Sequence, residues 1–305
     1  MPTSGLSDIL IPPYLKKGDK VAITCPAKKL PFPMTDAVNL LTTWGLEVVL
    51  GDTVNASYHQ FAGDDDLRAN DLQKFINDDS IKAIFAARGG YGTIRIVDKV
   101  DFSPLAQNPK WLIGFSDITL LHAHLLANLA LPCIHGQMPL NIPDASAYSL
   151  ETLRMALFGD PLAYQIEPNS LNRLGDGEGI LIGGNLSLLI AINGSVSDMD
   201  YAGKVLFLED VGEYLYAVDR MLRSLKRANK LKDLAGLIIG GFTDLKDNEI
   251  PFGQTLPQMV MDVVGDYSYP VCFDFPAGHL PNNCSLVLGK KIKLSVKTQQ
   301  VNISY

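Results

Sequence analysis

The sequence predicts a two-domain α/β protein, in which a parallel-sheet domain is followed by a strand-rich α+β domain. Its 305 residues are many for a single hydrophobic core. Strand and helix patterns alternate between residues 18 and 140, which is typical of helices packed on a parallel sheet. The alternation ends in a stretch rich in proline and glycine. We therefore expect an N-terminal domain over residues 1–150, a crossover over 151–177 and a C-terminal domain over 178–305.

Hydrophobic periodicity locates the elements of the N-terminal domain, because strands bury short apolar runs and helices bury every third or fourth residue. The expected strands span residues 21–24, 46–50, 81–86 and 111–115, and the expected helices span 37–44 and 64–76. This order is Rossmann-like or flavodoxin-like. Ligands in such folds bind at the carboxyl ends of the strands.

The second half of the chain has shorter elements. In the crossover we expect one helix over residues 150–157 and a loop at the glycine cluster 175–179. The expected elements of the C-terminal domain are strands at 179–182, 204–208, 237–239 and 271–273, a helix around 218–225, and two final antiparallel strands over 285–296 and 299–304.

Composition argues against several classes of function. A net charge of −7 does not suit a surface for nucleic acid or anionic membranes, which would need basic patches. The first ten residues lack the regions of a signal peptide, and no apolar stretch approaches the ~20 residues that span a bilayer. The four cysteines have no metal-ligand spacing, so we expect buried reduced thiols. These features predict a cytoplasmic protein that uses no metal or other cofactor.

Ser116 lies where an apolar strand pattern changes into a helical one. A serine at such a hinge exposes its Oγ beyond the sheet, next to backbone N–H groups that lack partners within the helix. Those groups and the helix dipole can stabilise an oxyanion, which makes Ser116 a candidate nucleophile. The alternative is that Ser116 or Asp117 only caps the helix, a position that both residue types favour.

The glycine-rich segment from Arg88 to Gly92 directly follows another strand. Its glycines allow a close approach of the backbone to a ligand, although the segment matches neither a Walker loop nor a dinucleotide-binding motif. The N–H group of Gly89 or Gly90, together with that of Asp117, would form a two-donor oxyanion hole. A simple tight turn is the alternative.

A serine nucleophile needs a base, and the chain offers five histidines. His279 and His135 are equally good candidates on sequence alone, because both lie near the ends of expected strands. His122 and His124 fall on the helix after Ser116, where a structural role is favoured, and His59 lies in a polar loop.

Glu209 is the candidate for orienting that base. It follows four apolar residues of an expected strand, where an unpaired charge would be costly, so we expect it to have a partner. The alternative is that Glu209, Asp210 and Glu213 cap the next helix. Both roles are compatible if Glu209 points inward to the base while Asp210 or Glu213 caps the next helix.

These segments belong to a set of five motifs. They are Arg88-Gly-Gly-Tyr-Gly, Gly114-Phe-Ser-Asp, Gly183-Gly-Asn-Leu, Leu208-Glu-Asp-Val-Gly-Glu and Gly278-His-Leu-Pro-Asn. In this order they resemble the LD-carboxypeptidases of serine peptidase family S66, which also contains microcin C immunity-type peptidases. The resemblance implies a triad of Ser116, Glu209 and His279. The second glycine of the GxSxG motif is missing, which counts against an α/β-hydrolase.

The resemblance implies a serine-type LD-carboxypeptidase, commonly a homodimer, that acts in the cytoplasm on small murein peptides. Its reaction would hydrolyse the amide bond between the L-centre of a diamino acid and a terminal D-alanine. Arg88, Tyr91, His135 and Asn185 are the candidates for binding the substrate. Two alternatives remain: an immunity-type peptidase that cleaves an aminoacyl-nucleotide amide with the same triad, and a two-domain ligand-binding protein without catalysis.

Overall fold

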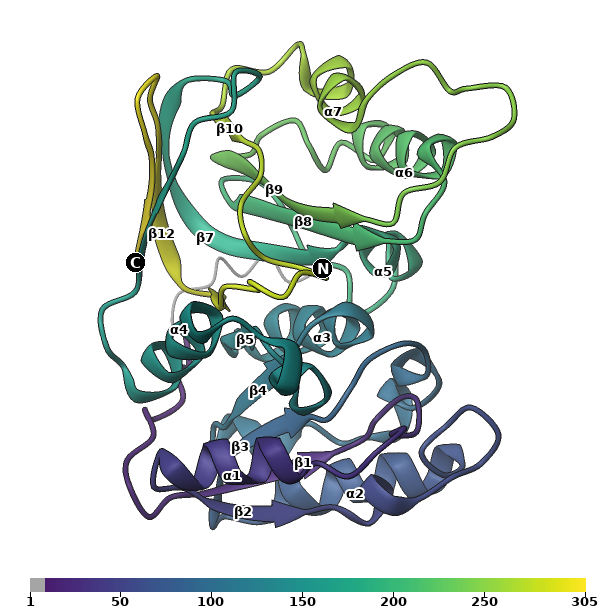
Figure 1. The fold of residues 1–305 in the computed structure, drawn as a ribbon, viewed down its shortest axis with the longest axis vertical. Helices are drawn as coiled ribbons and strands as arrows, with labels where there is room; N and C mark the ends of the chain where they lie inside the picture. The colour runs from purple at the N-terminus through teal and green to yellow at the C-terminus, as the bar shows by residue number, and fades with distance from the viewer. Residues whose placement is uncertain (1–8) are drawn as a thin grey trace.

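The protein consists of two β-sheets, one above the other in Figure 1, each with its own helices. The computed structural model describes residues 9–305. Residues 1–8 lie outside that range. The prediction that the first ten residues are not a signal peptide therefore falls mostly outside the described residues. None of the helices in the described range is both long and apolar enough to cross a membrane.

The first sheet has the strand order β11-β5-β4-β3-β1-β2, and its strands β1 to β5 run parallel. These strands are β1 (Lys20–Thr24), β2 (Glu47–Leu50), β3 (Ile81–Ala86), β4 (Trp111–Gly114) and β5 (Cys133–His135). The accompanying α-helices are α1 (Thr35–Thr43), α2 (Asp65–Asn77), α3 (Thr119–Leu129) and α4 (Ala147–Phe158). Short 3₁₀ helices are η1 (Asp52–Asn55), η2 (Thr93–Arg95), η3 (Val97–Lys99), η4 (Ser103–Ala106), η5 (Ser116–Ile118) and η6 (Pro139–Asp144).

Parallel pairing brings the carboxyl ends of β3, β4 and β5 to one edge of this sheet. Phe85 of β3 is opposite Ile113 of β4, and Gly114 of β4 is opposite His135 of β5. The segments that follow these strands therefore lie next to one another. The glycine-rich segment and Ser116 both belong to this edge, as the sequence predicted.

The second sheet has the strand order β10-β9-β8-β7-β12-β13-β6 and is mixed. Its parallel half consists of β7 (Gly175–Asn185), β8 (Val205–Val211), β9 (Gly236–Thr243) and β10 (Val271–Cys272). Its antiparallel half adds β12 (Lys291–Val296), β13 (Val301–Ser304) and β6 (Ala163–Ile166). Its helices are α5 (Leu186–Ala191), α6 (Leu215–Arg227) and α7 (Leu256–Val264).

The glycine cluster at residues 175–179, which the sequence predicts as a loop, is the first part of strand β7. A Cβ atom at Gly177 would collide with the carbonyl oxygen of Ala235, and one at Gly179 would lie 2.5 Å from that of Gly203. The glycines therefore allow neighbouring backbone to approach the strand rather than form a turn. Local composition cannot separate these two uses of glycine.

The prediction of a single strand over residues 285–296 is wrong, because this segment contains two strands. It is divided by Gly289, which has a φ of +88°, into β11 (Leu286–Leu288) and β12. Strand β11 pairs antiparallel with β5 and so belongs to the first sheet, whereas β12 belongs to the second. The chain thus returns to the first sheet near its end, because the buried apolar run of β11 fits the edge of that sheet.

Helix α3 joins the two sheets, and Figure 1 shows it between them. Thr119, its first residue, accepts a hydrogen bond from the backbone N–H of Asn185 at the end of β7, with a distance of 3.0 Å to its Oγ1. A Cβ atom at Gly184 would lie 2.6 Å from the same Oγ1, so glycine permits this close contact. The helix that begins beside Ser116 is therefore bound directly to the second sheet.

Candidate active site

Ser116 occupies a strained turn between β4 and α3. Phe115 is extended, with φ −156°, and Ser116 itself has a φ of +62°, in the left-handed region that residues other than glycine rarely adopt. Such outliers concentrate at functional sites. No side-chain cap is formed at the start of η5 or of α3, so neither Ser116 nor Asp117 has the simple capping role considered above. The turn leaves the Ser116 side chain half-buried at the sheet edge.

The glycine-rich segment lies against this turn. A Cβ atom at Gly89 would be 3.1 Å from the Cβ of Ser116 and 3.2 Å from the backbone nitrogen of Asp117. Gly90 follows with a φ of +107°. A side chain at residue 89 would thus press on the serine, and glycine keeps the two backbones in contact.

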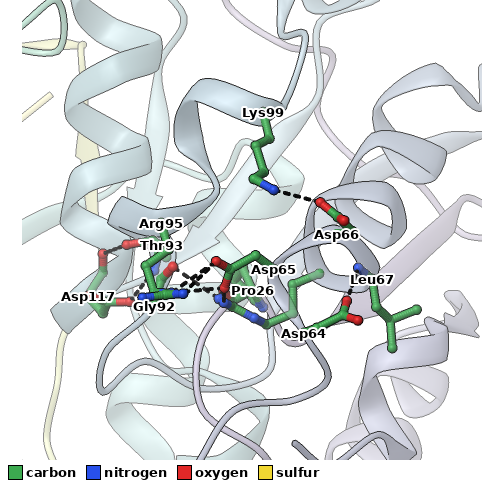
Figure 2. A network of polar contacts seen from close by, with 11 residues as sticks. Pro26, Asp64, Asp65, Asp66, Leu67, Gly92, Thr93, Arg95, Lys99 and Asp117 are labelled. Atoms are coloured by element: carbon green, nitrogen blue, oxygen red, sulfur yellow. Dashed lines mark hydrogen bonds and ion pairs between the residues drawn. The ribbon is translucent and has the colours of Figure 1, made fainter.

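Asp117 is bound to the end of the glycine-rich segment by two hydrogen bonds. The N–H of Thr93 donates to Asp117 Oδ2 at 2.9 Å, and the Thr93 hydroxyl donates to the Asp117 carbonyl at 2.9 Å. Burial raises the pKa of the Asp117 carboxyl, and hydrogen bonding of that carboxyl to Thr93 opposes the rise. Figure 2 shows that the contacts continue through Gly92 to charged residues at the start of α2.

Glu209 and His279 come together although they are 70 residues apart in the sequence. Glu209 lies on β8 with a side chain that is 0% exposed, and its Oε2 is 2.7 Å from Nδ1 of His279. Gly278, with a φ of +115°, brings the His279 loop against Glu209, since a Cβ atom there would lie 2.9 Å from the Glu209 Cβ. With Nδ1 engaged, Nε2 is the ring nitrogen that remains for another partner.

Phe115 connects this pair with the serine. The rings of Phe115 and His279 meet edge to face, with their centroids 5.0 Å apart. The His279 side chain is 21% exposed, so part of the ring is open to solvent beside the Ser116 turn. Among the hydrogen bonds of residues 9–305 there is none between Ser116 and His279. Catalytic contacts are often longer than ~3.2 Å before a substrate binds.

Asp210 and Asn185 both have structural partners. Asp210 is buried and accepts hydrogen bonds from Asn185 Nδ2 and from the N–H of Ser187, so it stabilises the start of α5 and not the following helix α6. Burial, and to a smaller extent the neighbouring Glu209 charge, raises the pKa of Asp210 to about 6. Asn185 Oδ1 caps α5 by accepting from the N–H of Leu188. Asn185 is 2% exposed, and its role as a substrate contact stays a prediction.

His135 lies beneath Phe115, away from the solvent, and its role as a substrate-binding residue stays a prediction. Its side chain is 0% exposed, and its ring packs 5.7 Å from Phe115 and 5.0 Å from Phe207 between centroids. Burial lowers the pKa of His135 to about 3, so the ring is neutral at pH 7. His122 is also fully buried, and His124 bonds to the hydroxyl of Ser197 at 2.9 Å.

Arg88 and Tyr91 remain accessible from the glycine-rich segment. Arg88 is half-buried and donates from Nη1 to the carbonyl of Lys29 at 2.8 Å, and burial lowers the pKa of its guanidinium. Tyr91 is 44% exposed, with its ring centroid 6.0 Å from that of Phe61. In the part of the chain that the structure describes, no three histidine, cysteine or acidic residues are grouped as metal ligands would be.

Two family models match this chain. The model of the LD-carboxypeptidase N-terminal domain matches residues 21–136, and that of the LD-carboxypeptidase C-terminal domain matches residues 178–294. The chain belongs to the LD-carboxypeptidase family. The two matched regions of this LD-carboxypeptidase contain Ser116 in the first and both Glu209 and His279 in the second.

Named relatives cover nearly the whole chain. A probable murein peptide carboxypeptidase of Bacillus subtilis is 34% identical over 290 residues, which is 93% of this chain and 91% of the relative. The crystal structure of a muramoyltetrapeptide carboxypeptidase from Oxalobacter formigenes matches with a TM-score of 0.85 and 27% identity, over 93% of this chain and 98% of that one. A microcin C7 self immunity protein shares the fold, with a TM-score of 0.87 and 20% identity over 97% and 98% of the two chains.

Three residues that support the site were not predicted from the sequence: Phe115, Thr93 and Arg68. Phe115 was treated only as an apolar strand residue, although its ring contacts that of His279. Thr93 and Arg68 were given no role, although both bind the glycine-rich segment or its neighbours. Thr93 is marked in the sequence only by its place directly after the glycines, and Arg68 by its place in the segment Asp66-Leu-Arg-Ala-Asn-Asp-Leu, which also resembles the family.

Proposed function

We propose that this protein is a serine-type LD-carboxypeptidase with a triad of Ser116, Glu209 and His279. The observation that carries the proposal is the buried Glu209–His279 pair, whose imidazole lies edge to face with Phe115, the residue next to the strained Ser116. Its substrate would be a murein peptide, cleaved between the L-centre of a diamino acid and a terminal D-alanine. The names of the Bacillus and Oxalobacter relatives support this substrate class.

In the proposed mechanism, Ser116 Oγ attacks the carbonyl carbon of the scissile amide while Nε2 of His279 takes the hydroxyl proton. Glu209 accepts the Nδ1–H bond, which keeps the ring in the required tautomer and stabilises the imidazolium. The oxyanion would receive hydrogen bonds from the N–H of Asp117 and that of Gly89 or Gly90. His279 then protonates the leaving amine, D-alanine departs, and a water molecule releases the acyl group by the reverse proton transfers.

Arg88, which is partly exposed at the start of the glycine-rich segment, is our candidate for attracting the terminal carboxylate, and Tyr91 is a second candidate contact. The overall charge of −7 does not attract an anionic peptide, so attraction must be local. We also propose that the protein acts in the cytoplasm as a homodimer. Its four cysteines are all buried free thiols, which supports a reducing compartment. Light scattering of the purified protein tests the dimer.

The decisive experiment measures release of D-alanine from a tetrapeptide that ends in D-alanine, with the peptide ending in L-alanine as control. We expect hydrolysis of the D-ended peptide alone. Ser116→Ala should lower kcat by roughly 10³-fold or more with its fold intact, because members of a triad act as a unit. Near-normal turnover by the folded variant would refute the serine mechanism.

An aminoacyl-nucleotide amide is the second candidate substrate. The fold shared with the microcin C7 self immunity protein favours testing it. If the protein cleaves such a compound but not the murein peptide, the proposed triad catalyses the immunity-type reaction. Binding of either compound without any Ser116-dependent turnover would instead indicate a non-catalytic ligand-binding protein.

A further inference from the structure

We propose that Arg68 is a positioning residue for the proposed Ser116 chemistry, acting through the Gly92–Thr93 peptide group on Asp117. The inference rests on the proposed function, since it concerns the oxyanion donors of that site. Arg68 lies on α2 and touches neither Ser116 nor the open surface. Figure 2 shows the chain of contacts that leads from α2 to Asp117.

The guanidinium of Arg68 is fully buried, and both of its terminal nitrogens form hydrogen bonds. Its Nη1 donates to the carbonyls of Pro26 at 2.7 Å and Gly92 at 3.0 Å, and its Nη2 pairs with Asp65. Asp65 is held in turn by both donor groups of Arg95, at 2.7–3.1 Å. A buried charge is retained only where such partners compensate its desolvation. The ion pair therefore fixes the guanidinium relative to the start of α2.

The Gly92–Thr93 peptide group connects the fixed guanidinium of Arg68 with Asp117. The carbonyl of Gly92 accepts from Arg68, and the N–H of Thr93, which belongs to the same planar peptide, donates to Asp117 Oδ2 at 2.9 Å. Because the peptide is planar, fixing its oxygen also fixes the direction of its N–H. Each of these bonds polarises the next. The Thr93 hydroxyl adds a second bond, to the backbone carbonyl of Asp117.

These contacts, from Arg68 through the Gly92–Thr93 peptide group to Asp117, form a relay that would position the two proposed oxyanion donors. Asp117 supplies one donor, its own N–H, and Gly89, at the other end of the glycine-rich segment, is so near that a Cβ atom there would lie 3.2 Å from that nitrogen. The segment closes directly on the guanidinium, since a Cβ atom at Gly92 would lie 2.6 Å from Nη1 of Arg68. A lysine could supply the charge, but it lacks the planar guanidinium group that donates to Pro26, Gly92 and Asp65 at the same time.

The test compares Arg68→Lys with wild type in two assays. The first is hydrolysis of the D-alanine peptide, where we expect kcat to fall roughly 30- to 100-fold with KM changed less than about threefold, because small displacements of oxyanion donors cost about this much. The second is the rate at which a fluorophosphonate phosphonylates Ser116, which should fall by a similar factor. Lys99→Met is the matched control: Lys99 pairs with Asp66, the neighbour of Asp65 on α2, and hydrogen-bonds to none of Asp65, Arg68 or Asp117, so both rates should stay near wild type.

Equal rates in wild type and folded Arg68→Lys, or equal losses in Arg68→Lys and Lys99→Met, would overturn the inference. If Arg68→Lys does not fold, Thr93→Val decides, since it removes only the hydroxyl bond to Asp117 and should lower kcat without raising KM. Unchanged kcat in that variant would also overturn the inference. Failure of wild type to react at Ser116 with the fluorophosphonate would refute the proposed function itself, which is a distinguishable result.

Discussion

Replacing Glu209 by glutamine tests the core of the proposed triad. The change removes one negative charge and keeps the shape of the side chain, at a position that is 0% exposed and 2.7 Å from His279 Nδ1. Since the carboxylate cannot reach solvent or a substrate, its effect on turnover must pass through the imidazole. We therefore expect a loss in kcat with KM nearly unchanged.

The magnitude follows from the charge that His279 acquires in the transition state. An imidazolium and a carboxylate with charge centres about 4 Å apart attract by about 4 kcal/mol at an effective dielectric constant near 20. A neutral amide oxygen in the same place would retain a hydrogen bond worth about 1 kcal/mol. The net loss of about 3 kcal/mol corresponds to a fall of roughly 10²-fold in kcat. An amide turned with its NH₂ toward Nδ1 would impose the wrong tautomer and raise the loss to about 10⁴-fold.

The assay follows D-alanine release at saturating peptide, with the thermal midpoint recorded for each variant. Asp210→Asn is the matched control, because Asp210 is the adjacent buried carboxylate but binds the start of α5 and not His279. We expect Asp210→Asn to lower the midpoint while kcat stays within a few-fold of wild type. A folded Glu209→Gln protein with kcat within threefold of wild type, or a loss no larger than that of Asp210→Asn, would show that Glu209 does not orient the base.

Three further outcomes are expected. His279→Ala should be as damaging to kcat as Ser116→Ala, and the double variant should be barely worse than either; additive losses would show that the two residues act independently. Below pH 6.5 the free energy of unfolding should fall, because burial lowers the pKa of His122 to about 3 in the folded state, so the unfolded state binds the extra proton between pH 6.5 and 3. His122→Leu should flatten this slope in denaturant titrations at several pH values, by a few kcal/mol at most, and an unchanged slope would contradict the assignment. Activity should survive exhaustive treatment with EDTA or phenanthroline, and a loss that zinc restores would show a metal requirement.

Local patterns predicted the part of the fold that local physics determines. The apolar run before Ser116 and the helical spacing after it predicted a strand, a turn and a helix, and β4, η5 and α3 are found there. The cost of burying Glu209 without a partner predicted that it would have one, and it bonds to His279. These results depend on burial and periodicity along a few adjacent residues.

Features that depend on pairing between distant segments were not accessible in the same way. The apolar pattern of β11 shows that it is buried but not which sheet buries it. His135 and His279 both follow strand ends, and only the packing of Phe115 and Phe207 around His135 separates the buried ring from the open one. The relay from Arg68 passes through a backbone carbonyl, which every residue possesses, so no side-chain pattern marks it.

The placement of β11 has a consequence for how the chain must be synthesised and handled. His279 lies between β10, which belongs to the second sheet, and β11, which completes the first. A fragment ending near residue 150 would leave the edge of β5 uncovered, and an uncovered edge invites association with other chains. We therefore expect the first sheet to be completed only after the last twenty or so residues leave the ribosome, and the two halves to be inseparable as soluble fragments. The same arrangement connects the His279 loop to both sheets, through β10 on one side and β11 on the other.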